Sequence, residues 1–315
     1  MSENSLFVHD DHLGHALNPG FSGPGVGRSF HTIDADGLRF TGEMPAPNDG
    51  LTGEEPIDQG PILAVGDSYT YGDEVRDEEA WPAQLQRLTG RRVLNGGVTG
   101  YGFDQMVLRT EQLVARYRPS VVVASFITHD VQRAEMRRMW WRNKPWFVVE
   151  NDRLVLKGVP VPKPGMTRVP RHIRGRLDTT LLSLPPILQH VFGYHVRVHR
   201  SGFGLEIAKR LVGRLAGLQA EHGIKVILMA QYPPDTWTNH WYLKHQRQLI
   251  EALLDCATAH GIATVDTYRR LATEPKPQDF YANAHMNARG NLAVASLLAV
   301  TLPTLVKQSL AKTDG

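Results

Sequence analysis

Cysteine is nearly absent from this sequence, since Cys256 stands alone among 315 residues. One cysteine cannot form an internal disulfide, which leads us to expect a cytoplasmic protein. The sequence also has no uninterrupted apolar run that approaches about 18 residues, the length expected of a membrane-spanning helix. Its first residues lack the basic start and apolar core of a secretory signal. These absences predict a protein without disulfides, membrane span or leader.

Charge is distributed unevenly along the chain. The net charge of the whole protein is +3, but residues 131–200 hold 14 Lys and Arg against 4 Asp and Glu, a balance of +10. The remainder of the chain therefore carries about −7. A basic segment indicates an anionic partner for that segment. Tryptophan side chains lie among these basic residues, which suits sugar rings, phosphates or carboxylates, while the sequence has no nucleic-acid-binding motif.

Two stretches interrupt an otherwise regular pattern. Residues 1–60 are rich in Gly, Pro and Asp, and we expect them to form a strap packed on a main domain of residues 61–315. Within that domain, residues 131–200 break the alternation of strands and helices. We expect them to form a basic cap or lid over the active-site edge of the sheet, with a solvated surface excursion as the alternative. A chain of this length can hold one large α/β domain with such additions.

Five short apolar runs are each followed by a helical pattern. Continuous apolar runs are typical of buried parallel strands, and strand–helix alternation predicts a parallel sheet with helices on both faces. Five strands of this kind commonly take the order 2-1-3-4-5. The sequence therefore predicts a flavodoxin-like three-layer α/β sandwich with its first strand in the centre. The five runs are residues 62–65, 92–95, 120–126, 224–230 and 262–266.

A serine follows the first of these runs, in Gly66-Asp67-Ser68. Open α/β sheets bind ligands at the carboxyl ends of their strands, next to the helices that follow. Backbone N–H groups of such a turn can face an anion. Ser68 is therefore a candidate nucleophile, and a serine that only caps the next helix is the alternative.

Other segments are expected at the same edge of the sheet. Gly97 follows the second run, and a glycine there can bring its bare N–H close to a ligand atom, although a flexible turn is the alternative. His129 follows the third run and Tyr232 the fourth. His285 precedes the last helical pattern, so its loop could fold back and meet Ser68.

Taken in order, these segments resemble the motif blocks of the SGNH, or GDSL, hydrolase superfamily. The resemblance covers roughly residues 61–130 and 205–305. It implies that Ser68 is the nucleophile, that the Gly97 N–H donates to the oxyanion and that His285 is the general base. It further implies ester hydrolysis or acyl transfer without a cofactor.

Two blocks depart from the pattern of the superfamily. His129 stands where the third block has its oxyanion asparagine; it could still donate one N–H, or only cap the strand end. Ala282 stands where the fifth block, D-x-x-H, has its aspartate. Asn283 or Asp279 could orient His285 instead, or a backbone carbonyl could do so.

The resemblance predicts a serine esterase or acyl hydrolase, with acyl transfer as a variant, acting on a small-molecule or glycan ester. A degenerate domain that binds an acylated glycan or partner without turning it over is the alternative. We expect four residues beside the blocks to contact substrate, and the spacing of His9, His12 and His15 does not favour a metal site. The four residues are Asp67, Tyr69, Asp130 and Tyr232.

Overall fold

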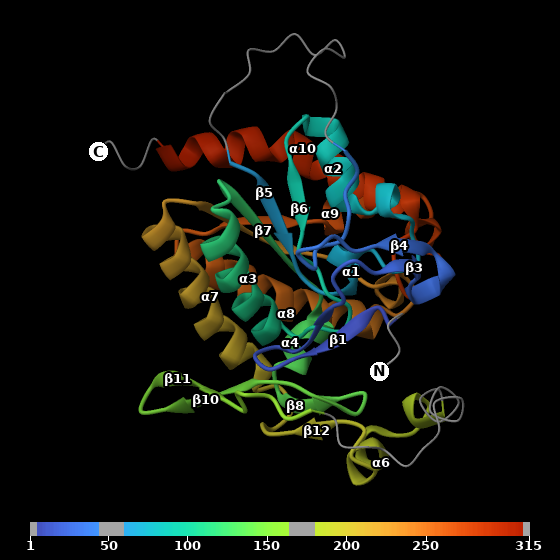
Figure 1. The fold of residues 1–315 in the computed structure, drawn as a ribbon, viewed down its shortest axis with the longest axis vertical. Coiled ribbons are helices and arrows are strands. Elements are labelled where there is room, and N and C mark those ends of the chain that lie inside the picture. The colour runs from blue at the N-terminus through green and yellow to red at the C-terminus, as the bar shows by residue number, and fades with distance from the viewer. Residues whose placement is uncertain (1–4, 44–59, 164–179, 311–315) are drawn as a thin grey trace.

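A computed structural model describes residues 5–43, 60–163 and 180–310, and its centre is a parallel sheet of five strands (Figure 1). The strands lie in the order β14-β13-β7-β5-β6, which is 2-1-3-4-5 along the chain, as predicted. Strand β5, which leads to Ser68, therefore lies inside the sheet between β6 and β7. The strands are β5 (Ile62–Val65), β6 (Val93–Asn95), β7 (Val121–Phe126), β13 (Lys225–Ala230) and β14 (Ala263–Asp266).

Helices cover both faces of the sheet, because alternate residues of each strand point to opposite sides. In β5, Leu63 and Val65 join one buried cluster, while Ile62 and Ala64 join another. Side chains of α3, α7 and α8 fill the first cluster, and those of α2 and α10 fill the second. The predicted three-layer α/β sandwich is thus confirmed. The helices are α2 (Trp81–Thr89), α3 (Phe103–Tyr117), α7 (Gly204–His222), α8 (His240–Ala259) and α10 (Ala288–Leu310).

Short helical turns follow the strands at the carboxyl edge of the sheet. The first, α1 (Ser68–Tyr71), comes directly after β5. The Asp67 carboxylate caps it by accepting a hydrogen bond from the Tyr69 N–H, and Gly72 ends it with a left-handed φ of 88°, a conformation that favours glycine. The other short turns are η2 (Asp77–Glu79), α4 (Thr128–Arg133), η3 (Pro234–Trp237), α9 (Tyr268–Leu271) and η4 (Pro277–Phe280).

The described N-terminal residues pack on the same core. Buried Leu13, Leu17 and Leu38 belong to the cluster that α3 and α7 share, and an isolated bridge joins Arg39 to Asn95 at the end of β6. Residues 1–4 and 44–59 of the predicted strap lie outside the described residues, and its standing as a separate unit stays a prediction. The elements are β1 (Phe7–Asp10), β2 (Gly14–Leu17), β3 (Ser22–Pro24), η1 (Val26–Arg28) and β4 (Phe30–Thr32).

The basic insertion forms small antiparallel sheets beyond α4 (Figure 1). A buried ion pair joins Lys144 to Asp104 of α3, and a partly exposed pair joins Arg197 to Glu135. Residues 164–179 of the insertion lie outside the described part of the chain, and its role as a lid stays a prediction. The elements are β8 (Met136–Met139), β9 (Arg142–Asn143), β10 (Trp146–Glu150), β11 (Arg153–Lys157), α6 (Pro186–Val191) and β12 (Val196–Arg197).

Helix α10 is the most apolar helix of the described residues. Residues Ala288–Val306 are long and apolar enough to cross a membrane by length and composition alone, with a mean hydropathy of 1.4. A search for uninterrupted apolar runs overlooks this stretch because Arg289 and Asn291 interrupt it. In the structure α10 packs on α2, with Leu298 and Leu302 buried in the core between them. Part of its apolar surface therefore has a place in the outer layer of the sandwich, while Val300 is 78% exposed.

Replacing Arg39 with methionine should destabilise the fold strongly. Its guanidinium is fully buried, 2.9 Å from Asp77 Oδ1, and it donates hydrogen bonds to the carbonyls of Tyr71, Gly72 and Val75. Removing one partner of a buried ion pair typically costs about 3–5 kcal/mol. Urea unfolding measures the loss.

Arg116→Met is the matched control for Arg39→Met. The pair between Arg116 and Asp36 is 56% and 40% exposed, and such surface pairs contribute about 0–1 kcal/mol. Equal losses of stability in the two variants would contradict an anchoring role for Arg39.

Candidate active site

Ser68 begins α1 where the chain turns sharply after β5. Gly66 makes the turn possible, because a Cβ atom there would lie 2.3 Å from Thr70 Oγ1 and 2.6 Å from the carbonyl oxygen of Ser125. Only a residue without a side chain fits so close to its neighbours. The turn leaves Ser68 at the carboxyl end of a central strand, as the sequence predicts.

His285 lies 217 residues further along the chain and directly beside Ser68. Its Nε2 is 2.9 Å from Ser68 Oγ. Tyr69 holds the loop of His285 in place, because its hydroxyl donates to the Ala284 carbonyl at 2.6 Å and its ring lies 5.3 Å from the imidazole. A hydroxyl and an imidazole at this distance have the geometry of a nucleophile and its base. Tyr69 therefore positions the loop, and its contact with substrate stays a prediction.

Two carboxylates that the sequence analysis missed face this imidazole. Asp73 Oδ2 is 3.7 Å from His285 Nε2, and Glu74 Oε1 is 3.6 Å from His285 Nδ1. Among the described residues, the buried Nδ1 has no hydrogen-bond partner. The available signal was the Asp73-Glu74 pair itself, which follows Ser68 by little more than one helical turn.

Asp67 and Asp130 share the guanidinium of Arg133, a residue that the sequence analysis also missed. Arg133 Nη1 is 3.1 Å from Asp67 Oδ2 and 2.6 Å from Asp130 Oδ1. Burial, followed by the charge of Asp67, raises the pKa of Asp130 well above its usual range. Both carboxyl groups are almost inaccessible, with 1% and 2% of each residue exposed. They therefore support the turn and bind Arg133, and their contact with substrate stays a prediction.

Asp67 Oδ2 also lies 3.2 Å from the Ser68 hydroxyl. A hydroxyl donates only one hydrogen, so Asp67 and His285 compete for it. The distance to His285 is the shorter of the two, which favours the imidazole as its acceptor.

Tyr232, for which the sequence predicts contact with substrate, is a buried residue. Its side chain is fully inaccessible beneath the loop that follows β13, and its carbonyl accepts a hydrogen bond from the Tyr281 hydroxyl. Periodicity places this residue in the right loop but does not say which way its ring points.

The two residues expected to bind an oxyanion both have partners. The Gly97 N–H donates to Asn95 Oδ1 at 3.1 Å, and a Cβ there would lie 2.4 Å from the backbone nitrogen of Tyr71. Close packing against α1 therefore explains this glycine, and the geometry does not favour its predicted role. His129 Nε2 is 2.9 Å from the Tyr242 hydroxyl. Burial, and then the charge of Arg133, lowers the pKa of His129 to about 4.

Neither candidate expected to orient His285 does so through its side chain. Asn283 is exposed, and its backbone N–H donates to Glu74 Oε2 at 3.1 Å. Asp279 is also exposed, and its carbonyl accepts a hydrogen bond from the Asn287 side chain. The carboxylates nearest to the imidazole come instead from the turn after α1.

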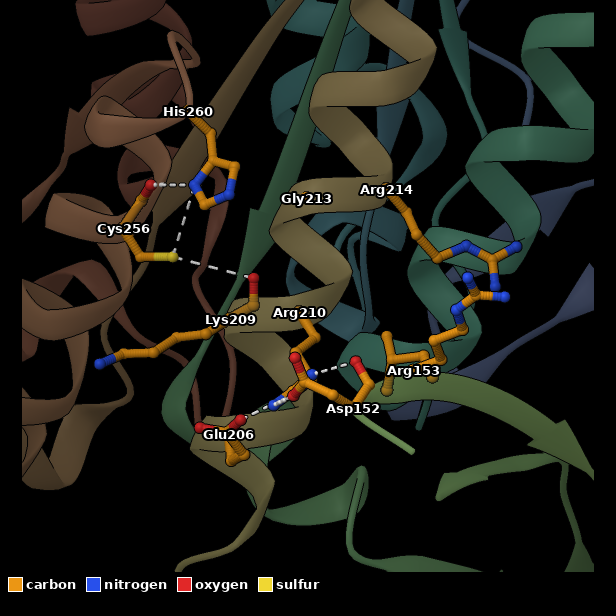
Figure 2. Close-up of a pocket in the computed structure, with 10 residues that line it drawn as sticks. Asp152, Arg153, Glu206, Lys209, Arg210, Gly213, Arg214, Cys256 and His260 are labelled. Carbon is orange, nitrogen blue, oxygen red and sulfur yellow. Dashed lines mark hydrogen bonds and ion pairs between the residues drawn. The ribbon is translucent and has the colours of Figure 1, made fainter. Parts of the chain in front are cut away.

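A pocket away from Ser68 and His285 lies between α7, α8 and the β10–β11 hairpin (Figure 2). It contains Cys256, the other residue with nucleophilic chemistry that the sequence brings to notice. Burial raises the pKa of the Cys256 thiol, which disfavours the reactive thiolate. Arg210 in this pocket is paired with Asp152 and Glu206. The pocket therefore lacks the features of an activated nucleophile.

Metal binding finds no support in the part of the chain that the structure describes. No three His, Cys, Asp or Glu side chains gather there in a way that could hold an ion. Of the histidines near the N-terminus, His9 pairs with Asp11 and His15 with the Thr99 carbonyl.

Asp73→Asn should make the protein more stable near neutral pH, where Asp73 is charged. Burial raises the pKa of Asp73 from 3.8 to about 6, with His285 and the Thr99 hydroxyl acting in the opposite direction. The contribution of Asp73 to the stability of the wild type is therefore fully present below about pH 4, and it is lost as the pH rises through about 6. The difference in unfolding free energy between variant and wild type should grow over that range, by up to about 3 kcal/mol. Urea titrations at several pH values measure it.

Asp279→Asn, which changes an exposed carboxyl group, is the control for Asp73→Asn. Its difference from wild type should stay flat over the same range. A flat difference for Asp73→Asn would show that Asp73 is not buried as a charge.

Comparison with known proteins gives one family match. The description "GDSL-like Lipase/Acylhydrolase family" matches residues 64–293. No curated protein matches the chain.

Several solved structures are similar to this chain. One is an alpha/beta hydrolase enzyme from the metagenome of Lake Arreo, Spain, with 17% identity and a TM-score of 0.48, over 77% of this chain and 94% of the other. A member of the lipolytic protein G-D-S-L family from Veillonella parvula has 16% identity and a TM-score of 0.45, over 76% and 95%. An acetylxylan esterase from Geobacillus stearothermophilus has 14% identity and a TM-score of 0.46, over 78% and 94%.

The family match spans well over half of the chain, from β5 to α10. It includes both Ser68 and His285, which the fold brings within hydrogen-bond distance. The chain therefore belongs to the GDSL-like lipase/acylhydrolase family.

Proposed function

We propose that this protein is a serine hydrolase that cleaves an acyl ester. The observation that carries the proposal is the 2.9 Å distance between Ser68 Oγ and His285 Nε2. Ser68 attacks the acyl carbonyl carbon while His285 takes the hydroxyl proton, and the proton passes to the leaving alcohol as its C–O bond breaks. Water, deprotonated by the same imidazole, then releases the acid and restores Ser68. An alcohol in place of water would give acyl transfer by the same steps.

The charge that develops on the carbonyl oxygen needs preorganised N–H donors. We assign the first to the Ser68 N–H at the start of α1. For the second we choose Gly100 over Gly97, because among the described residues the Gly100 N–H donates to no acceptor. Gly100 has a left-handed φ of 81°, and its Cβ would lie 2.7 Å from the Trp140 ring. The hydroxyl of neighbouring Thr99 donates to Asp73, which ties this loop to the site.

His129 is a further candidate donor, in the place of the asparagine of the third block. With a pKa lowered to about 4 it is neutral at pH 7, and a neutral imidazole has one N–H to donate. Where Nε2 accepts from the Tyr242 hydroxyl, that hydrogen is on Nδ1. In our proposal Tyr242 therefore sets which nitrogen of His129 is the donor.

A polar acyl ester, such as an acylated saccharide, fits these surroundings best. The Arg133 guanidinium lies 5.4 Å from the centre of the Trp140 ring, and Trp140 belongs to the basic insertion. Tryptophan and arginine side chains suit sugar rings and anionic groups. The binding-only alternative rests on the missing aspartate at position 282, whereas the Ser68–His285 distance supports turnover.

Ser68→Ala should abolish both cleavage of a short-chain aryl ester and labelling by a fluorophosphonate. Loss of the nucleophile in such a site typically lowers kcat by about 10⁴-fold or more. Ester hydrolysis by a spectrophotometric assay and mass spectrometry of the labelled protein are the measurements.

Cys256→Ser is the matched control for Ser68→Ala. It removes the one thiol, which lies in the pocket between α7, α8 and the β10–β11 hairpin (Figure 2). It should keep wild-type activity. A wild-type protein that is neither labelled nor active between pH 6 and 9 would contradict the proposal.

A further inference from the structure

We propose that Glu74 is the positioning residue for His285, in place of an aspartate at position 282, and that the N-terminal segment holds Glu74 in that place. This inference rests on the proposed hydrolase function. It concerns the group that faces Nδ1, the nitrogen on the far side of the imidazole from Ser68. It also gives residues 5–43 a part in the active site.

Glu74 already lies where such a residue must lie. Its Oε1 is 3.6 Å from His285 Nδ1, and its Oε2 accepts a hydrogen bond from the Asn283 N–H at 3.1 Å. The two side chains are only 19% and 13% exposed for His285 and Glu74. Catalytic hydrogen bonds are often long in free enzymes and shorten when the imidazole takes up the proton. Glu74 is therefore placed to accept the Nδ1–H and to stabilise the imidazolium that forms.

The other groups around the imidazole do not meet this requirement. Asp73 lies 3.7 Å from Nε2, the nitrogen that Ser68 occupies, so it cannot select the tautomer with hydrogen on Nδ1. The ring of Tyr69 packs against the imidazole, but its hydroxyl donates to the Ala284 carbonyl. Asn283 contributes its backbone N–H to Glu74. Glu74 is thus the described carboxylate on the Nδ1 side.

The backbone of Glu74 needs support from its surroundings. Its φ of 68° lies in the left-handed region, and such sparsely populated conformations are energetically unfavourable for residues other than glycine. They persist only where neighbouring structure holds them. A non-glycine residue in this conformation beside a candidate base is therefore a reason to look for what holds it.

Two parts of the N-terminal segment supply that support. The buried guanidinium of Arg39 donates to the carbonyls of Gly72 and Val75, on either side of the Asp73-Glu74 pair. Gly27 of η1 lies so close that a Cβ on it would be 2.8 Å from the Glu74 Cα and 2.6 Å from the Glu74 Cγ. Gly27 of the N-terminal segment therefore packs closely against Glu74, and Arg39 of the same segment fixes the backbone before and after it.

Glu74→Gln tests the positioning role, because it keeps the shape of the side chain and removes its charge. We expect kcat to fall by about 10²- to 10⁴-fold with little change in KM, by analogy with the loss of the orienting carboxylate in a catalytic triad. Glu78→Gln, which changes an exposed residue of η2, should match wild type. Adding Ala282→Asp to the Glu74→Gln variant should restore part of kcat by returning a carboxylate to the position usual in the family.

A readout that does not depend on turnover separates this inference from the proposed function. In ¹⁵N NMR of the histidine side chains, wild-type His285 should carry its hydrogen on Nδ1, and Glu74→Gln should shift it toward Nε2. An unchanged His285 spectrum, or a kcat within about twofold of wild type while Ser68→Ala is inactive, would overturn the role of Glu74. Absence of Ser68-dependent activity in the wild type would instead count against the hydrolase.

Gly27→Ala tests the part of the N-terminal segment, with Gly20→Ala as its matched control. Both glycines have left-handed φ values, 74° and 75°, so both substitutions introduce similar backbone strain. A Cβ at Gly20 meets nothing within 4 Å, whereas a Cβ at Gly27 meets Glu74. We expect Gly27→Ala to lower kcat at least tenfold more than Gly20→Ala, with KM unchanged. Equal kcat values in the two variants would overturn the supporting role of the segment.

Discussion

The hydrogen bond between Ser68 Oγ and His285 Nε2 joins two elements from opposite ends of the α/β domain. Its length depends on how firmly each element is held. Helix α10 packs on α2, and Asn291 accepts a hydrogen bond from the Trp81 N–H. The loop before α10 is bound to α1 through the Tyr69 hydroxyl. These contacts connect the end of the chain to elements that follow β5. They therefore fix the distance between His285 and Ser68.

Acidic side chains lie near this pair. Asp73 and Glu74 lie 3.7 and 3.6 Å from nitrogens of His285, while Asp67 and Asp130 bind Arg133. Burial raises the pKa values of Asp73 and Asp130, so holding these two groups in their charged form costs free energy. The arrangement costs folding free energy in the resting protein and lowers the energy of the imidazolium that forms during acyl transfer.

The sequence predicts the fold well where a single pattern decides it. Strand β5 has the bounds that its apolar run indicates, because a strand buried on both faces needs an apolar residue at every position. The pairing of Ser68 with His285 is predictable because parallel strands bring their carboxyl ends to one edge. Asp73 and Glu74 are not predictable in this way, since their positions depend on the left-handed turn at Gly72 and Glu74. No periodicity reports that turn.

The departure at position 282 has a physical reading that sequence spacing conceals. What the base needs is a carboxylate on its Nδ1 side, and chemistry does not require that the carboxylate precede the histidine by three residues. In this chain the Ala282 N–H donates to the His285 carbonyl, which closes the loop tightly. The Nδ1 side of the ring is then open to the turn after α1, where Glu74 stands. Since that turn is braced by Arg39, the geometry of the base depends on residues that precede the family match altogether.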